Sequence, residues 1–521
     1  MSGVSACKEA RPKQHIVFMN IAATGHMNPT LPLVSELCSR GCRVSYFVED
    51  SMREVVEAAG ATWHSFQYPD SDFTGIMRNP SDFASLSPST LAGLGIPEGA
   101  SLKEYGFPFS MIYNAQLVLP SLLDSLRSLD PAPGAIVYDP FLACARVAAH
   151  VLGVPAISLF VMPGPGVLSG GSDAMAQAEA KPWVQRPRRW IQEKYGLDLL
   201  ATGGLMEFYS PVENLVTTID SLFMPATSQR QVRLFGRFPF RCVGVMADEK
   251  VRIENAGRGS DRPKCGSDYI QASSSNEVLE QLREARASGK RIVFISLGTV
   301  ATGRMWTIPL GHMAEQNDAG RPEGARGLPE YSGKELCQQV YRSCFEALGG
   351  DRDILALLAT GLCDDALEGL LPPVPSNFLV VPSVPQLEVL KLCDAFVTHG
   401  GANSMHEALS FGVPLAVVPI FGDQPFNADS VARCGAGVSF RNPLRTLNSS
   451  SLRSAVQSLL QLETGDGSIG SNPYRSAALA VSKQLADAGG APAAAKAVLD
   501  AVRDHLEIHG TVTSTRSRYD A

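Results

Sequence analysis

Short apolar runs alternate with helix-like patterns through the first half of the chain. The run His15–Ala23 suits a strand buried in a parallel sheet. After Asn28 and Pro29, which are typical of a helix start, apolar residues repeat at helical spacing as far as Gly41. Further strands are predicted at Cys42–Val48, Ala61–Phe66, Gly134–Tyr138 and Val154–Phe160. Because the strands alternate with helices, this half predicts a doubly wound parallel sheet.

The second half repeats the alternation. Strands are predicted at Arg291–Leu297, Ile354–Ala359, Phe378–Val381, Ala395–Thr398, Pro414–Ile420 and Ala436–Phe440. Two segments interrupt the pattern. Ala247–Asn276 is rich in Gly, Ser and charge and is expected to be a linker, while Thr302–Ser332 is a long insertion directly after a strand. Two large α/β domains therefore account for most of the chain.

Composition narrows the class of protein further. The 521 residues are 45% apolar, which is enough for full cores, and a net charge of −7 gives no footprint for nucleic acid. The 11 cysteines form no CxxC pair, which favours reduced thiols over disulfides or a zinc site. No apolar run is typical of a membrane span or a secretion signal, so we expect a cytoplasmic protein, and we expect a monomer.

A histidine and an aspartate follow two strands of the first half. His26 comes after the first strand and Asp139 ends the strand at Gly134–Tyr138. Ligands of parallel sheets collect at the carboxyl ends of the strands, where a carboxylate could orient an imidazole as a base. Two simpler interpretations stay open: His26 as a surface or capping residue, and Asp139 as a helix N-cap before Pro140. No GxSxG motif is present, which disfavours acyl-transfer hydrolysis.

A strand–turn–helix pattern in the second half suits an anion. After Thr398, His399 and two glycines precede a helix that begins near Asn403. Backbone N–H groups and the dipole at such a helix start favour phosphate, and Gly401 leaves room for close approach. The segment from Ser404 to Glu407 also fits a plain capping box, which remains an alternative.

Other polar residues follow neighbouring strands of this half. Gly298 and Thr299 could reach a phosphate from the other side, Asp423 and Gln424 could hold sugar hydroxyls, and Gln386 opens a helix beside the turn. Ordinary loop polarity is the alternative for Asp423 and Gln424.

Several segments resemble, in order, the nucleotide-sugar-dependent glycosyltransferases of family 1. This family includes plant glucosyltransferases, bacterial macrolide glycosyltransferases and animal UDP-glucuronosyltransferases, and the soluble macrolide-type and plant branch is the most similar. The matching segments are GHMNPTLPL, VYD, SLGT, VPQLEVL, FVTHGGANSMHEAL, GVP and DQPFNA, from Gly25 to about Gly437.

The resemblance implies a GT-B fold, with two Rossmann-like, doubly wound parallel-sheet domains facing across a cleft. We expect an acceptor-binding domain over 1–240, a linker over 241–285 and a nucleotide-sugar-binding domain over 286–485. A helix over 486–510 would return to the first domain, and 511–521 would form a tail.

The resemblance also assigns roles to the polar residues. His26 would be the general base and Asp139 its partner. The nucleoside would lie against Ser383, Val384, Gln386 and Glu407. The diphosphate would be held by Gly298, Thr299, His399, Gly401, Asn403 and Ser404, and the sugar by Asp423 and Gln424.

The expected reaction is an inverting, metal-independent transfer of a sugar, glucose by expectation, from a UDP-sugar to a hydroxyl of a small apolar acceptor of secondary metabolism. The UDP-sugar is a co-substrate, and no cofactor or metal is expected. A nucleotide-sugar epimerase and a non-catalytic nucleotide-sugar binder are the alternatives.

Two features depart from the family or leave the acceptor open. Ser383 stands where plant enzymes carry a Trp that stacks on uracil, so base stacking must come from elsewhere. The segments Leu91–Tyr113 and Met162–Tyr209 are rich in aromatic residues, and they either line an apolar acceptor pocket or belong to the core.

Overall fold

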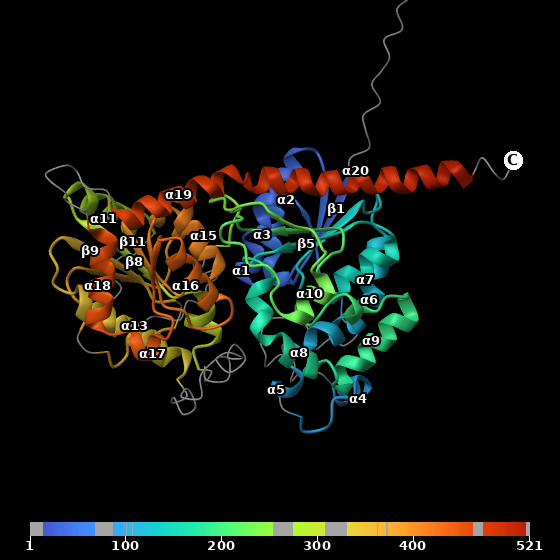
Figure 1. The fold of residues 1–521 in the computed structure, drawn as a ribbon, viewed down its shortest axis with the longest axis horizontal. Helices are drawn as coiled ribbons and strands as arrows, with labels where there is room; N and C mark the ends of the chain where they lie inside the picture. The colour runs from blue at the N-terminus through green and yellow to red at the C-terminus, as the bar shows by residue number, and fades with distance from the viewer. Residues whose placement is uncertain are drawn as a thin grey trace, which may run out of the picture.

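Two lobes lie side by side, each built on its own parallel sheet (Figure 1). The structure is a computed structural model, and it describes residues 14–67, 87–100, 102–106, 108–253, 275–307, 331–361, 363–370, 373–461 and 472–516. Residues 308–330 of the predicted insertion and 254–274 of the predicted linker lie outside the described residues.

The first lobe contains a seven-stranded parallel sheet in the order β3-β2-β1-β4-β5-β6-β7. Its strands are β1 (His15–Met19), β2 (Arg43–Phe47), β3 (Thr62–His64), β4 (Ala135–Tyr138), β5 (Ala156–Phe160), β6 (Glu213–Val216) and β7 (Phe240–Cys242). Its α-helices are α1 (Thr24–Met27), α2 (Leu31–Ser39), α3 (Arg53–Ala58), α4 (Pro88–Leu94), α5 (Leu102–Tyr105), α6 (Ser110–Arg127), α7 (Ala143–Leu152), α8 (Ser172–Ala178), α9 (Pro182–Tyr195) and α10 (Gln229–Phe235). Short helical turns are η1 (Asp50–Met52), η3 (Pro165–Gly171) and η4 (Leu199–Ala201).

The second lobe contains a six-stranded parallel sheet in the order β10-β9-β8-β11-β12-β13. Its strands are β8 (Arg291–Ser296), β9 (Ile354–Ala359), β10 (Phe378–Val381), β11 (Ala395–Thr398), β12 (Leu415–Val417) and β13 (Gly437–Ser439). The helical elements of this half are α11 (Ser275–Ala287), η5 (Val300–Arg304), α13 (Gly333–Leu348), α14 (Gln386–Leu390), α15 (Ala402–Ser410), α16 (Gln424–Arg433), α17 (Pro443–Thr446), α18 (Ser449–Leu460), α19 (Pro473–Asp487) and α20 (Gly490–Arg516).

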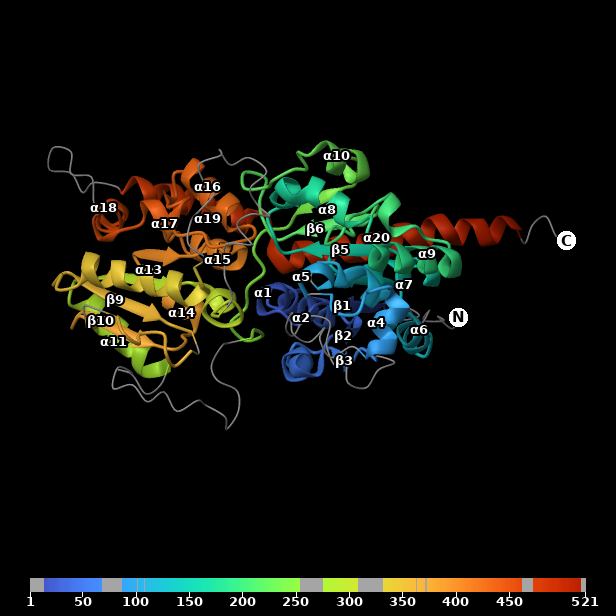
Figure 2. The same cartoon turned by 90° about the horizontal axis from the view of Figure 1, so that it is seen from below.

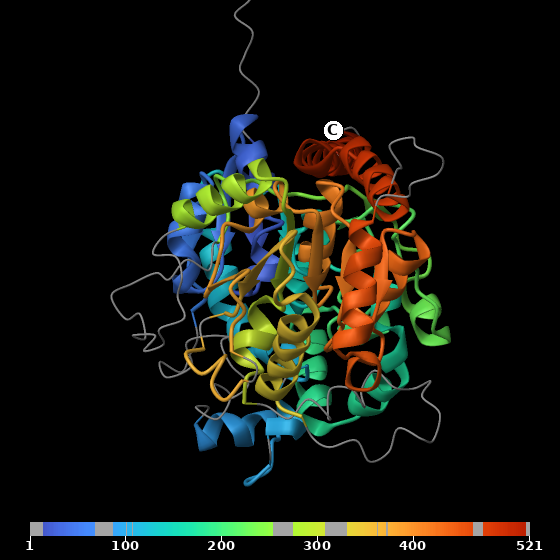
Figure 3. The same cartoon turned by 90° about the vertical axis from the view of Figure 1, so that its left-hand side faces the viewer.

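The apolar runs form strands because both faces of each sheet are covered. All five residues of β1 are buried, and alternate β1 side chains join one apolar cluster on each face of the first sheet. The second sheet likewise separates two clusters, and Figure 3 views this lobe end-on with its strands between layers of helices. Helices on both faces of a parallel sheet make the doubly wound, GT-B-type fold that the sequence predicted.

The last helix joins the two lobes. It runs along one side of the molecule from the second lobe across the first (Figures 1 and 2). Ala494, Val498 and Val502 pack into the cluster that also contains α2 side chains. The helix runs to Arg516, past the expected end at 510.

One local prediction was wrong, and one open choice is decided. The helix after β1 does not begin at Asn28, because α1 fills the preceding turn and α2 begins at Leu31 with Thr30 as its N-cap. For several aromatic and Met side chains of Leu91–Tyr113 and Met162–Tyr209, the structure supports the core interpretation, since they are at most 6% exposed. They are Met111, Tyr113, Trp183 and Phe208.

Candidate functional site

Both groups of predicted site residues lie where the strand order of a sheet reverses. In the first sheet β1 lies beside β4, with Met19 level with Tyr138, so the turns that carry His26 and Asp139 leave adjacent strands. In the second sheet β8 lies beside β11, with Ser296 level with Thr398. Crevices at the carboxyl ends of such strands are the usual ligand sites of open α/β sheets.

His26 and Asp139 contact each other directly. His26 Nδ1 lies 2.5 Å from Asp139 Oδ2, and the other carboxylate oxygen accepts from the backbone N–H of Phe141 at 2.8 Å. The side chain of Asp139 is 2% exposed and that of His26 is 18% exposed. A neutral imidazole that donates from Nδ1 to the carboxylate carries its lone pair on Nε2, so the pair can present a base to a ligand. Asp139 thus serves both as partner of His26 and as acceptor for a backbone N–H beside α7.

Asn20, the residue after β1, holds the turn that carries His26. Asn20 Nδ2 donates to the His26 carbonyl at 3.0 Å, and its Oδ1 accepts from Ile21 N–H at 2.7 Å. The ring of Phe141 lies 5.1 Å from the imidazole ring, between centroids. Sequence reasoning missed both Asn20 and Phe141. A polar residue directly after an apolar strand was the available signal for Asn20.

In the second lobe, the imidazole of His399 lies between two glycines. A Cβ on Gly298 or on Gly401 would overlap the ring, and Gly298 has φ of +75°, which favours glycine. Burial lowers the pKa of His399 to about 4, and a hydrogen bond with the Ser296 backbone acts in the opposite direction. His399 is therefore neutral at pH 7, although its edge is partly exposed. Thr299 follows Gly298 and is exposed at the same end of the sheet.

The N-terminus of α15 brings further predicted donor residues together. Glu407 is 4% exposed. Its Oε2 accepts from Gln386 Nε2 at 2.7 Å, and the same amide lies 3.4 Å from Ser404 Oγ. The capping-box interpretation of Ser404 and Glu407 is wrong, because the N-cap is Gly401 and both residues lie inside the helix. Ser383 and Val384 precede α14 and are partly buried.

Asp423 and Gln424 lie at the start of α16. Asp423 Oδ2 accepts from Asn427 Nδ2 at 2.7 Å. Burial raises the pKa of Asp423, while Asn427 and the nearby His26 act in the opposite direction. Gln424 is 3% exposed, and its Oε1 accepts from the backbone N–H groups of the preceding loop at 2.8 and 3.0 Å. Gln424 therefore shapes the loop, and Asp423 faces the other lobe.

The two half-sites are in direct contact across the lobes. Asn403 Nδ2 donates to the carbonyl of Gly25 at 2.7 Å, one residue before His26. One turn further along α15, His406 Nε2 lies 2.8 Å from Thr218 Oγ1, which follows β6 of the first lobe. The base candidate and the helix start that was predicted to hold the anion thus lie at one junction.

Comparison with known proteins shows that the chain is similar to glycosyltransferases. Residues 367–466, which include β11 and α15, match the family model "UDP-glucoronosyl and UDP-glucosyl transferase". The chain is 27% identical over 456 residues to the NDP-glycosyltransferase YjiC of Bacillus subtilis, covering 86% of this chain and 89% of that protein. It is 25% identical to the oleandomycin glycosyltransferase of Streptomyces antibioticus, covering 81% of this chain and 78% of that protein.

These matches support a family 1 glycosyltransferase. Its fold agrees, since the glycosyltransferase of kitacinnamycin aligns with a TM-score of 0.60 at 22% identity, over 94% of this chain and 99% of that one. This glycosyltransferase is a transferase that takes its sugar from a nucleotide sugar.

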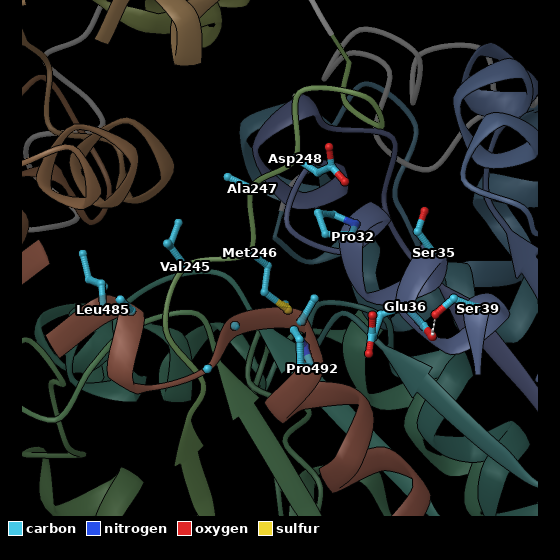
Figure 4. A pocket seen from close by; sticks show the side chains of 14 residues that line it. Pro32, Ser35, Glu36, Ser39, Val245, Met246, Ala247, Asp248, Leu485 and Pro492 are labelled. Carbon is cyan, nitrogen blue, oxygen red and sulfur yellow. Dashed lines mark hydrogen bonds between the residues drawn. The ribbon is translucent and has the colours of Figure 1, made fainter. Parts of the chain in front are cut away.

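A surface pocket of the glycosyltransferase lies away from this junction (Figure 4). It holds about 540 Å³ between α2, the segment 245–248 and the turn from α19 to α20. It is lined by none of the candidate donor or catalytic residues.

Within the described part of the chain, no helix has the length and apolar character needed to span a bilayer. No group of three or more His, Cys, Asp or Glu side chains could ligate a metal ion there.

Proposed function

We propose that this glycosyltransferase moves a sugar from a UDP-sugar to a hydroxyl of a small, largely apolar acceptor, with inversion at the anomeric carbon. His26 Nε2 takes the proton of the acceptor hydroxyl as its oxygen bonds to the anomeric carbon. The bond from that carbon to the diphosphate oxygen breaks at the same time, and UDP leaves. No metal ion takes part in this scheme.

The observation that carries the proposal is the contact of His26 with Asp139 at the mouth of the first sheet. The covered carboxylate holds the imidazole in one tautomer and stabilises the imidazolium once the proton is taken. An epimerase needs no acceptor pocket, and a plain nucleotide-sugar binder needs no base.

The second lobe is proposed to bind and stabilise the departing diphosphate. The first turn of α15 offers backbone N–H groups, and Asn403 and Ser404 add side-chain donors. Asp423, with its carboxylate near His26, is the proposed partner of the sugar hydroxyls. UDP as the nucleotide rests on the matching family model.

The acceptor class is proposed from apolar side chains of the first lobe and from one relative. Phe109, Met162 and Trp190 are partly exposed beside the first-lobe core and are the proposed apolar contacts. The similarity to an oleandomycin glycosyltransferase favours a polycyclic or macrolide-like acceptor.

The test is UDP-glucose with a panel of hydroxylated apolar acceptors, read by mass spectrometry, with the anomeric configuration read by NMR. His26→Ala should reduce transfer by about 10²- to 10⁴-fold. His150→Ala, which removes an exposed imidazole at the end of α7, is the matched control and should leave transfer unchanged. Wild-type rates in His26→Ala would refute the base, and an epimerised sugar from donor alone would refute the transferase proposal.

A further inference from the structure

The segment 251–253, which follows β7, is held against the first lobe by one side chain. Asn28 Oδ1 accepts from Ile253 N–H at 2.7 Å, and Asn28 Nδ2 donates to the Ile253 carbonyl at 3.3 Å. Val251 packs into the first-lobe cluster that contains α2. Asn28 itself is 8% exposed and lies two residues after His26. A residue close to His26 thus holds this segment in place.

The residue between these two anchors reaches the second lobe. Arg252 Nη1 lies 3.3 Å from Glu407 Oε1, and the two side chains are 12% and 6% exposed. The other oxygen of this carboxylate accepts from Gln386 at 2.7 Å. A guanidinium with so little exposure is stabilised by an anionic partner, and it carries five N–H donors, of which this contact uses one.

The candidate donor residues supply no other formal positive charge. None of them is Lys or Arg, and His399 is neutral at pH 7 because burial lowers its pKa to about 4. The N-terminus of α15 contributes only about half a charge. A nucleoside diphosphate carries at least two negative charges, and Glu407 adds another to the site. Among the described residues, Arg252 is the cation in contact with a candidate donor residue.

Binding of a nucleotide would change the partner of Arg252. Ribose hydroxyls that donate to Glu407 compete for the oxygen that Arg252 now contacts. Arg252 released from Glu407 would lie beside an anionic diphosphate at the start of the same helix, and charge-assisted hydrogen bonds from guanidinium to phosphate are among the stronger ones in proteins.

We propose that Arg252 is a donor-binding residue: its guanidinium, paired with Glu407 in the free enzyme, transfers to the diphosphate when the nucleotide sugar binds. This inference rests on the donor site of the proposed function. It assigns nucleotide affinity to the segment between the lobes, which is held in place by Asn28.

The test compares two ligands that differ only in the diphosphate. Dissociation constants for UDP and for uridine are measured by calorimetry on the wild type, Arg252→Gln and Arg252→Lys. Arg252→Gln should weaken UDP by about 10-fold or more, with uridine changed by less than about 3-fold. Arg252→Lys keeps the charge, so its affinity for UDP should lie between those of the wild type and Arg252→Gln. Thermal melting checks that each variant is folded.

A neighbouring ion pair supplies the matched control. Lys391 pairs with Glu249, two residues before the segment 251–253, and both side chains are at least 41% exposed. Lys391→Gln breaks this contact between segment and lobe but should leave UDP affinity unchanged. An equal loss of UDP and uridine affinity in Arg252→Gln, or the same loss in Lys391→Gln, would overturn the inference alone. A wild type that binds no UDP would overturn the proposed function, and this inference with it.

Discussion

The buried imidazole of His406 should make the stability of this glycosyltransferase depend on pH. His406 is 2% exposed on α15. Its Nδ1 donates to the Ala402 carbonyl at 2.7 Å, so Nε2 accepts from Thr218 across the lobes. Burial lowers the pKa of His406 to about 4 from an ordinary 6.5, and the bond to Ala402 acts in the opposite direction. The neutral imidazole is therefore favoured in the folded protein.

The magnitude follows from the two pKa values. Above pH 6.5 His406 is neutral in both states, and its full contribution to stability is present. As the pH falls from 6.5 towards 4, the unfolded chain binds a proton that the folded chain does not, so stability is lost. With a folded value of about 4, the loss between pH 7.5 and 5.0 is about 2 kcal/mol for this one group.

The assay is urea unfolding at pH 7.5 and 5.0, followed by tryptophan fluorescence. His406→Gln keeps an acceptor for Thr218 and does not titrate. Its loss of unfolding free energy between the two pH values should be smaller than that of the wild type by about 2 kcal/mol. His150→Gln controls for removal of an exposed imidazole and should behave as the wild type does. The same pH dependence in His406→Gln and the wild type would refute the reasoning.

Three further variants test the junction. Asp139→Asn should lower kcat by about 10²- to 10⁴-fold with little change in donor KM, because the residue acts through His26; steady-state kinetics with an unchanged kcat would contradict this. Gly298→Ala should weaken UDP binding by calorimetry and cost about 1–3 kcal/mol in urea unfolding, since its Cβ overlaps the His399 ring at a φ of +75°; unchanged UDP affinity would count against that site. Asn427→Ala removes two hydrogen bonds of 2.7 Å that tie α16 to the turn before α15 and to the loop carboxylate. The substitution should lower the free energy of unfolding by about 1–3 kcal/mol and raise the KM for the donor. Neither change would be seen if other contacts hold the Asp423 carboxylate in place.

The strands that the sequence predicted are those with continuous apolar runs. Ile354–Ala359 and Phe378–Val381 are strands with the bounds predicted. β6 was missed because Glu213 and Asn214 interrupt its apolar pattern. The structure tolerates Asn214 in the core because its side chain bonds to Ser158 Oγ at 2.6 Å and to backbone groups on both sides. Such pairing cannot be read from a local window.

The turn before α15 could be predicted from the sequence, but the partners of the polar side chains beside the two half-sites could not. The sequence suggested that Asn28 caps a helix, and the structure gives both of its polar atoms to Ile253, which is 225 positions away. Likewise Asn403 bonds to a carbonyl 378 positions away. Local spacing identifies a polar residue beside a site, whereas the contact that orients it depends on how the two lobes pack.

One face of α15, the helix proposed to bind the nucleotide, contacts the first lobe and the segment 251–253. Asn403, His406 and Glu407 are spaced at i, i+3 and i+4, so they share this face. They contact Gly25 in the turn that carries His26, Thr218 after β6, and Arg252, respectively. A nucleotide bound at the start of this helix would therefore either replace or depend on the contacts between α15 and the first lobe. Donor affinity and lobe position are then linked through the same side chains, and a variant that alters one should alter the other.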